Sequence, residues 1–142
     1  ELVRALEDCL GFNDLTGAVL VGAGKLGGAL LHYEGFERFG VRIMAAFDQN
    51  MQAVNPDAKP AILPMSSFKS FCKENNIRIG IITVVEESAQ EICNQMVDSG
   101  IAAIWNFAPC KLIVPDHIHI QNENLALSLA HLSNKLSRGS ED

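Results

Sequence analysis

The sequence predicts an α/β fold with a doubly wound parallel sheet. Short apolar runs alternate along the chain with segments whose apolar residues recur at helical spacing, and successive βαβ units produce this alternation. The run Ile79–Ile82 contains no polar side chain, which is typical of a parallel strand covered by helices on both faces. The chain of 142 residues is long enough to form one such domain with a full core.

The strands are predicted from short apolar runs bounded by residues that favour turns. Five runs fit this description: Ala18–Val21, Arg42–Phe47, Ile79–Val84, Ile101–Phe107 and His117–Gln121. The segment Gln49–Pro64 interrupts the alternation and carries Pro56, Pro60 and Pro64. Because proline has no backbone donor and restricts its neighbours, we expect this segment to be a loop over the edge of the sheet.

The helices predicted between these strands are Gly24–Tyr33, Ser66–Glu74 and Ser88–Ser99. Helical spacing in the first of them places four apolar residues on one face: Leu26, Ala29, Leu30 and Tyr33. The third is followed by Gly100, and glycine suits the left-handed conformation that commonly ends a helix.

The segment Asn124–Leu136 is predicted to be a C-terminal helix that is apolar on more than one side. One stripe consists of Leu125, Leu129, Leu132 and Leu136, and Ala126, Leu127 and Ala130 extend the apolar surface to another side. A helix of this kind needs more than one partner surface. The pattern leaves two arrangements open, which are packing against a second subunit and docking on the helix's own sheet.

A glycine-rich turn follows the first predicted strand. Val21 leads into Gly22, Ala23, Gly24, Lys25, Leu26 and Gly27, the G-x-G-x-x-G pattern between a strand and a helix. Gly22 permits the tight turn, Gly24 lets the backbone approach a pyrophosphate, and Gly27 lets the helix pack closely. The free N–H groups at the helix start then face the phosphates. We therefore predict a Rossmann-like domain that binds a dinucleotide, the alternative being a glycine-rich turn without a ligand.

An acidic residue lies where such a domain binds the adenosine ribose. Asp48 comes 26 residues after Gly22, at the end of the second predicted strand. A carboxylate there accepts hydrogen bonds from the ribose hydroxyls and repels a 2′-phosphate, so NAD is favoured over NADP.

Composition argues against several functions. The net charge is −6 and the lysines and arginines form no cluster, whereas a DNA-binding surface needs basic residues to neutralise phosphates. No apolar run approaches the roughly 20 residues that a membrane helix needs. The four cysteines are far apart and form no C-x-x-C pair, which favours a reduced, cytoplasmic protein.

No catalytic or metal site is predicted, and the chain is not expected to be an enzyme. His32 and His131 are expected to be packing or surface residues of helices, and His117 and His119 lack a third metal ligand nearby in the sequence. A dehydrogenase needs a proton donor or acceptor near the nicotinamide, and that group normally lies on a second domain. Cys110 lies beside the predicted crevice, where a buried, inert thiol is commoner than a reactive one.

Two stretches of the sequence resemble the Rex family of redox-sensing transcriptional repressors. The first is Val21–Phe36 with its continuation Ala45–Asp48, and the second is Asn106–Pro115, which begins Asn-Phe-Ala-Pro. The resemblance covers nearly the whole chain. It implies a homodimer that senses the ratio of NADH to NAD and releases operator DNA when NADH binds.

The resemblance also implies an order of domains. Residues 1–13 would end the connection from an N-terminal winged helix that is absent from this chain. Residues 14–121 would form the Rossmann NAD(H)-binding domain, and residues 122–142 the dimerisation helix, swapped between subunits, and a tail. As given, the chain is expected to bind the cofactor but to reach an operator only through the winged helix.

The family's site residues carry over by position. The resemblance implies that Gly22–Gly27 cradle the pyrophosphate and that Asp48 binds the adenosine ribose. Val84 and Val85 would lie along the cofactor, and Asn106 and Phe107 near its nicotinamide end. Tyr33 would face the dimer interface near that end. The chain departs from the family's usual residues at Val85, Glu86, Asn124 and Ser128.

Two other functions stay open. The chain could be the CoA- or nucleotide-binding domain of a ligase resembling succinyl-CoA synthetase, for which a catalytic histidine with a charged partner would be expected in a cleft. It could also be a stand-alone NAD-binding module that has lost DNA binding, which the residues at Asn124 and Ser128 would fit.

Overall fold

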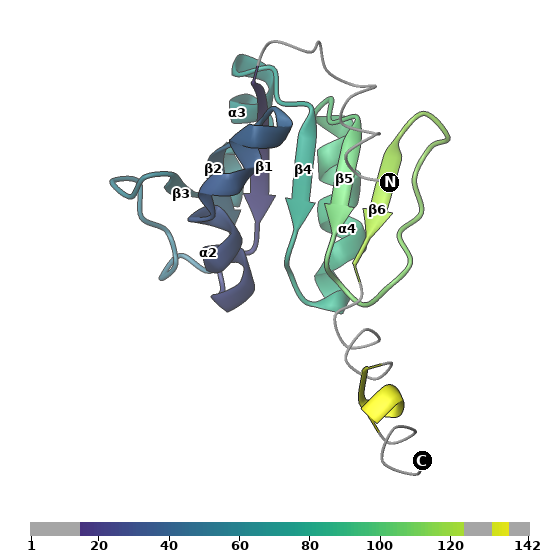
Figure 1. The fold of residues 1–142 in the computed structure, drawn as a ribbon. Coiled ribbons are helices and arrows are strands. Elements are labelled where there is room, and N and C mark those ends of the chain that lie inside the picture. Colours follow the sequence, from purple (N-terminus) through teal and green to yellow (C-terminus); the bar gives the residue numbers. More distant parts are fainter. Residues whose placement is uncertain (1–14, 124–131, 137–142) are drawn as a thin grey trace.

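The computed structural model describes residues 15–123 and 132–136, and they contain one six-stranded sheet (Figure 1). The strands lie in the order β3-β2-β1-β4-β5-β6, and every neighbouring pair is parallel. Their bounds are β1 (Thr16–Val21), β2 (Val41–Asp48), β3 (Ala61–Pro64), β4 (Ile79–Ile82), β5 (Ala103–Asn106) and β6 (His119–Asn122). The predicted parallel sheet is therefore confirmed, and all five predicted strands are present with slightly different ends.

The prediction that Gln49–Pro64 is entirely a loop is wrong at its C-terminal end. Ala61–Pro64 form the strand β3, which pairs with β2 from Ala45 to Asp48 and is the edge strand of the sheet, where an isolated antiparallel bridge joins Ile62 to Asn55. An edge strand tolerates proline because the outward backbone groups need no ladder partner. The three prolines led to the prediction of a loop, although Ala61, Ile62 and Leu63 favour a strand.

Helices cover both faces of the sheet, as the prediction of a doubly wound fold requires. On the face toward the viewer in Figure 1 lie α2 (Lys25–Leu31) and the 3-10 helix η1 (Glu34–Phe39). On the far face lie α3 (Phe68–Glu74), preceded by the 3-10 helix η2 (Met65–Ser67), and α4 (Glu86–Asp98). The connection from β1 to β2 thus uses one face, and the connection from β3 to β4 uses the other.

The predicted apolar face of the first helix is only partly right. Gly27 and Leu31 are the buried residues of α2, whereas Leu26 and Tyr33 are 36% and 56% exposed and Ala29 is exposed too. Residues four apart share a helix face, so α2 turns its Gly27–Leu31 side to the sheet. The close approach at Gly27, described below, decides this orientation rather than the number of apolar side chains.

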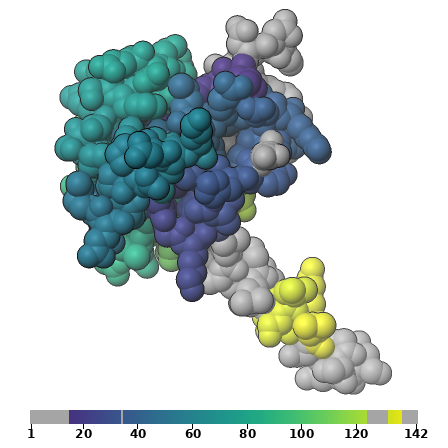
Figure 2. All heavy atoms as spheres, turned by 90° about the vertical axis from the view of Figure 1, so that its left-hand side faces the viewer, coloured from purple at the N-terminus to yellow at the C-terminus, as the bar shows by residue number. Residues whose placement is uncertain are grey.

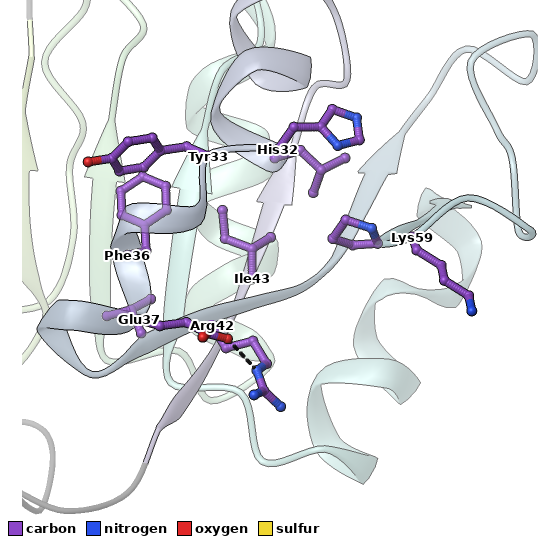
Figure 3. A pocket seen from close by; sticks show the side chains of 10 residues that line it. His32, Tyr33, Phe36, Glu37, Arg42, Ile43 and Lys59 are labelled. Carbon is purple, nitrogen blue, oxygen red and sulfur yellow. Dashed lines mark hydrogen bonds and ion pairs between the residues drawn. The ribbon is translucent and has the colours of Figure 1, made fainter.

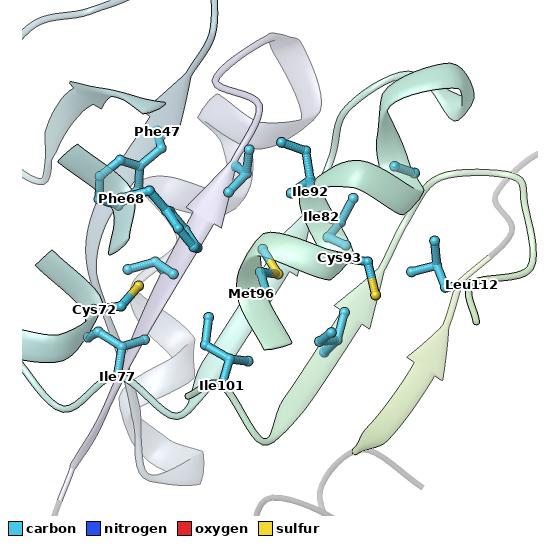
Figure 4. Packing of buried hydrophobic residues seen from close by; sticks show 14 of the residues in the cluster. Phe47, Phe68, Cys72, Ile77, Ile82, Ile92, Cys93, Met96, Ile101 and Leu112 are labelled. Atoms are coloured by element: carbon cyan, nitrogen blue, oxygen red, sulfur yellow. The ribbon is translucent and has the colours of Figure 1, made fainter. Parts of the chain in front are cut away.

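The core between the sheet and the helices α3 and α4 is aliphatic and aromatic (Figure 4). Four residues of α4 at helical spacing are completely buried: Ala89, Ile92, Cys93 and Met96. From β2, Phe47 contacts Phe68 of α3 edge-to-face, with ring centroids 5.0 Å apart. The helix α4 ends before Gly100, whose φ of +93° confirms the predicted left-handed C-terminal position.

A helical turn at residues 132–136 is the described part of the predicted C-terminal helix. Its Leu132 and Leu136 are 56% and 69% exposed, and the turn lies clear of the sheet in two perpendicular views (Figures 1 and 2). Residues 1–14, 124–131 and 137–142 lie outside the described part, so the predicted N-terminal connection and helix exchange between subunits stay predictions. Within residues 15–123 and 132–136, no helix has both the length and the apolar character to cross a membrane.

Candidate functional site

The strand order of the sheet has a switch point between β1 and β4. From β1 the chain proceeds to β2 and β3 on one side, and from β4 it proceeds to β5 and β6 on the other. β1 pairs with β2 on one side and with β4 on the other. In open α/β sheets, ligands bind in the crevice outside the carboxyl ends of the strands at such a switch point. The glycine turn after β1 and the segments after β4 and β5 all begin at this edge, which is the lower edge in Figure 1.

The glycine turn has the backbone geometry that its sequence predicts. Gly22 adopts a φ of +102°, which side chains disfavour, and its N–H donates to the carbonyl of Phe47 at 2.8 Å. A side chain at Gly27 would overlap the carbonyl oxygen of Gly22, so the helix packs directly on the turn. At Gly24 a Cβ would meet no atom within 4 Å, which leaves its backbone open to a ligand.

The N-terminus of α2 offers backbone donors beside this open glycine. Gly24 caps the helix without a side-chain hydrogen bond, so no side chain takes up the N–H groups of the first turn. Lys25 and Leu26, the next two residues, are exposed. This arrangement fits the pyrophosphate that the sequence predicts here, whereas the contacts themselves stay a prediction.

The carboxylate of Asp48 is held against the glycine turn. Its Oδ2 accepts a hydrogen bond from the N–H of Ala23 at 2.9 Å, and its Oδ1 accepts one from the N–H of Asn50 at 2.8 Å. Asp48 is half-buried at the end of β2, and each oxygen keeps further acceptor capacity. The predicted ribose acid therefore lies beside the predicted pyrophosphate turn with its orientation already fixed.

Thr83 belongs to this site and was not predicted from the sequence. Its hydroxyl, directly after β4, lies 3.0 Å from the carbonyl oxygen of Val21 and 2.5 Å from that of Gly22. A Cβ placed on Gly22 or on Gly27 would approach the same hydroxyl at 2.9 Å. Thr83 thus ties β4 to the glycine turn across the switch point. A polar residue directly after a fully apolar strand is the signal that could have identified it.

Val84 and Val85 follow Thr83 and lead into α4. Val84 is half-buried and packs against the core cluster on the α4 side, whereas Val85 is 66% exposed and precedes the first residue of α4. Both predicted cofactor residues thus lie at the carboxyl end of β4, and Val85 has the more accessible side chain. Glu86 and Glu87 give the first turn of α4 two acidic side chains.

Asn106, at the end of β5, is completely buried. Its Nδ2 lies within 3.3 Å of the carbonyl oxygens of Ala108 and Cys110 and 3.0 Å from the Oδ1 of Asn122. Its Oδ1 accepts the N–H of Ala108 at 3.0 Å. The side chain that was predicted to lie near the nicotinamide is therefore engaged within the protein, and its contact with a cofactor stays a prediction.

Phe107 and Tyr33 lie at opposite ends of a series of aromatic contacts on the α2 side of the sheet. Phe107 lies 4.7 Å from Trp105, Trp105 lies 5.8 Å from Phe36, and Phe36 lies 4.9 Å from Tyr33, measured between ring centroids. Tyr33 is 56% exposed. The two aromatic residues predicted at the nicotinamide end are therefore connected through side chains, although α2 and β5 are far apart in the sequence.

The three cysteines in the described part of the chain, Cys72, Cys93 and Cys110, all have raised pKa values. Burial raises the pKa of Cys72 and of Cys93 to about 11, and for Cys93 the nearby Cys110 adds to the effect. Burial, followed by the negative charge of Glu86, raises the pKa of Cys110 as well. Such thiols are poor nucleophiles at neutral pH. Among the described residues, no three His, Cys, Asp or Glu side chains come together as a metal site.

A surface hollow of about 490 Å³ lies away from the switch point (Figure 3). It is lined by the end of α2, by η1, by Val41–Ile43 at the start of β2, and by Lys59 and Pro60. Glu37 and Arg42 form an ion pair at its rim, with Oε1 and Nε 3.0 Å apart. Because it adjoins the amino end of β2, the hollow is not the predicted cofactor crevice.

A family model and the curated relatives agree on the class of domain. The model described as a CoA binding domain matches residues 13–110. A redox-sensing transcriptional repressor Rex from Bacteroides fragilis is 42% identical over 137 residues, covering 96% of this chain and 62% of that protein. The Rex protein from Clostridium perfringens strain SM101 is 38% identical over 133 residues, which is 93% of this chain and 63% of that protein. The chain thus spans somewhat less than two thirds of these relatives.

Solved structures lead to the same family. The repressor RSP, described as a Rex-family repressor, is 31% identical with a TM-score of 0.82, over 98% of this chain and 67% of that one. RSP in complex with NADH is 32% identical with a TM-score of 0.80, covering 98% and 68% of the two chains. RSP with NAD+ and operator DNA reaches a TM-score of 0.84 at 31% identity, covering 98% and 64%. More distant dehydrogenases, such as a myo-inositol 2-dehydrogenase from Lactobacillus plantarum at 15% identity, share the fold alone.

Proposed function

The chain belongs to the Rex family of redox-sensing transcriptional repressors, and we propose that it is the part of such a repressor that binds NADH and NAD and responds to their ratio. The observation that carries this proposal is the combination of the glycine turn with Asp48. The two features meet at the switch point of the sheet, and the carboxylate accepts a hydrogen bond from the turn itself.

The residues of the turn fit a dinucleotide. Gly24 leaves the space that a Cβ would fill free of protein atoms, and the first N–H groups of α2 lie beside it without a side-chain cap. In the proposed complex these donors hold the pyrophosphate, and Asp48 accepts hydrogen bonds from the adenosine ribose. The negative charge of Asp48 disfavours a 2′-phosphate, so the proposed cofactor pair is NADH/NAD rather than its phosphorylated counterpart.

The other half of the proposed crevice is apolar. Val84 and Val85 follow β4, and Phe107 follows β5, so an uncharged wall would face the nicotinamide end of a bound dinucleotide. Phe36 and Trp105 lie between Tyr33 and Phe107, and Tyr33 lines the hollow at the amino end of β2, so its proposed place near the nicotinamide rests on the resemblance alone. Val84, Val85 and Phe107 orient a ring, and none of these three carries the acid or base that hydride chemistry would require. We therefore place the chain among regulators rather than enzymes.

The proposed regulation is a shift between two arrangements of a homodimer. One of the two arrangements cannot hold DNA. NADH favours that arrangement if its affinity for it is higher than its affinity for the other, and the ratio of the two affinities sets the size of the shift. The exposed Leu132 and Leu136 support a C-terminal helix that packs on a second copy. Contact with an operator would require a winged-helix domain in addition to residues 1–142, and the proposed location is the cytoplasm.

Calorimetric titration with NADH, NAD and CoA tests the proposal. We expect NADH and NAD to bind at one site per chain and CoA to bind at least tenfold more weakly, because CoA has a 3′-phosphate and no second ribose. The variant Gly24→Val, which fills the open space beside α2, should abolish binding of NADH and NAD. Binding of CoA without binding of NADH would refute the proposal and favour the ligase alternative.

A further inference from the structure

We propose that Asn106 is a positioning residue, not a cofactor ligand: its buried side-chain amide fixes the segment after β5 at the nicotinamide end of the crevice and ties it to β6 through Asn122. This inference deepens the proposed function and rests on it. It is carried by the hydrogen bonds of one side chain and by the position of that side chain in the sheet.

The nitrogen and the oxygen of the Asn106 amide both have hydrogen-bond partners within the protein. A primary amide provides two N–H donors, and three acceptors surround Nδ2: the carbonyl oxygens of Ala108 and Cys110 and the Oδ1 of Asn122. The amide oxygen is occupied by the N–H of Ala108 at 3.0 Å. The residue is 0% exposed. A ligand would have to displace one of these partners to reach the amide, and a buried polar group that loses its partner costs free energy.

These bonds fix Phe107 from both sides. Phe107 lies between Asn106 and Ala108, which are joined by the side-chain amide in both directions. Its own N–H donates to the carbonyl of Ile82 at 2.9 Å, the last residue of β4. The ring of Phe107 is therefore held at the carboxyl end of the sheet next to the segment that follows β4, where the nicotinamide end is proposed.

The same amide connects this segment to β6. Asn106 and Asn122 are register partners in the parallel ladder, and the N–H of Glu123 donates to the carbonyl of Asn106 at 2.8 Å. The side-chain bond to Asn122 adds a second link at the last residues of β6. Asn122 is exposed, so its side chain can be changed without opening the core.

A second amide fastens the far part of the same loop. Gln90 of α4 donates from Nε2 to the carbonyl of Ile113 and accepts the N–H of Ile113 at Oε1, both at 2.9 Å. The loop between β5 and β6 is thus held by Asn106 at its start and by Gln90 near its middle. Both groups are uncharged, so this attachment does not change with pH.

The affinities for NADH and for ADP-ribose, measured by calorimetry, distinguish positioning from direct binding. ADP-ribose contains the part of the cofactor assigned to the glycine turn and Asp48 but lacks the nicotinamide. Asn122→Ala removes the acceptor that lies on β6. The two N–H groups of Asn106 then keep only the carbonyls of Ala108 and Cys110, so the side-chain link between this loop and β6 is lost. The loop then populates orientations that do not bind, and the apparent affinity falls in proportion. We expect a loss of about threefold to tenfold for NADH, which is the size of one hydrogen bond, and less than twofold for ADP-ribose.

Two variants make the comparison specific. Asn122→Asp keeps an acceptor at the same position and should restore the affinity for NADH. Asn75→Ala is the control, because Asn75 is exposed like Asn122 and its side chain donates a hydrogen bond to the carbonyl of Phe71 at 2.9 Å, at the end of α3 away from the crevice. Amide hydrogen exchange in the cofactor-free chain adds a readout independent of binding. Exchange at Ala108 should be faster in Asn122→Ala and unchanged in Asn75→Ala.

Three results would overturn the inference while leaving the proposed function standing. An equal loss for NADH and ADP-ribose in Asn122→Ala would indicate a general effect on the fold. A loss for NADH in Asn106→Ser together with parental behaviour of Asn122→Ala would show that the loop is not positioned through Asn122. A parent chain that binds ADP-ribose but gains nothing from the nicotinamide would refute positioning at that end and leave the glycine-turn assignment intact. A parent chain that binds neither compound would instead refute the proposed function, and this inference with it.

Discussion

Replacing Thr83 with valine should loosen the glycine turn while leaving the shape of the side chain nearly unchanged. The hydroxyl of Thr83 contacts the carbonyl oxygens of Val21 and Gly22, and the oxygen of Val21 keeps the backbone N–H of Thr83 at 2.9 Å when the hydroxyl is removed. The oxygen of Gly22 would face a methyl group instead. Gly22 is buried, so this carbonyl would lose its hydrogen bond without gaining access to water.

The expected cost is that of one lost hydrogen bond with its acceptor left buried, about 1–3 kcal/mol. For a domain of this size, that cost corresponds to a fall in Tm of about 3–10 °C. The turn would also hold its N–H groups less firmly, so the affinities for NADH and for ADP-ribose should fall together, by about fivefold or more. Thermal unfolding followed by circular dichroism and calorimetric titration measure the two effects.

Thr83→Ser is the matched control, because it keeps the hydroxyl and removes the methyl group. We expect its Tm to lie within about 3 °C of the parent and its affinity for ADP-ribose to stay within twofold. If Thr83→Val and Thr83→Ser behave alike in both assays, the hydroxyl does not hold the turn, and the role assigned to Thr83 is wrong.

Three further predictions concern other parts of the chain. Asp48→Asn keeps an acceptor for the N–H of Ala23 but removes the charge, so calorimetry should show about tenfold weaker binding of NADH and a smaller preference for NADH over NADPH; an unchanged preference would exclude Asp48 from the ribose site. Leu132→Asp should convert the proposed dimer into a monomer in light scattering, whereas Ile113→Asp, at a position that is 79% exposed, should leave the mass unchanged. The thiols of Cys72 and Cys93 have a pKa of about 11 in the folded chain. They therefore keep their protons at pH values where the thiols of the unfolded chain lose theirs. The free energy of unfolding should decrease as the pH rises from about 9 to 11. Urea unfolding across this range should show a shallower decrease for the variant with both cysteines replaced by alanine, and an equal slope would contradict the assigned pKa values.

The parts of the site that could be predicted from the sequence are those determined by local backbone geometry. The turn Gly22–Gly27 requires glycine at positions where a side chain would be strained or would overlap a neighbour, so its spacing alone identifies it. Asp48 was predictable because the second strand of such a unit ends at a known distance from the turn. The predicted parallel sheet followed from the alternation of apolar runs and helical segments.

The parts that could not be predicted depend on contacts between distant segments. Thr83 reaches the glycine turn 61 residues away, and Asn106 meets Asn122 across a ladder whose register no local pattern specifies. The strand β3 is stabilised by pairing with β2, against the local preference of Pro64 at its end and of Pro60 directly before it. The orientation of α2 follows from the contact between Gly27 and Gly22 rather than from its apolar stripe.

The two halves of the proposed crevice differ in a way that bears on how a redox state could be detected. The half formed by the glycine turn, Asp48 and Thr83 is held by hydrogen bonds within the protein, and it would contact the part of the cofactor that NADH and NAD share. Contacts of that kind raise both affinities equally, so they do not make the equilibrium between two arrangements depend on the oxidation state of the cofactor. Any difference must therefore arise at the nicotinamide end, where we propose that Phe107 lies.

That end is also the one connected to the rest of the proposed dimer. Phe107 is fixed through Asn106 to the end of β6, and the chain continues from β6 toward the exposed Leu132 and Leu136. A displacement of Phe107 by one oxidation state of the ring would strain the amide contacts to Asn122, and β6 would carry that strain toward the C-terminal segment. The contacts of the glycine turn and Asp48 thus set the affinity that both cofactors share. The smaller difference between the affinities for NADH and NAD acts on the half that leads to the second subunit.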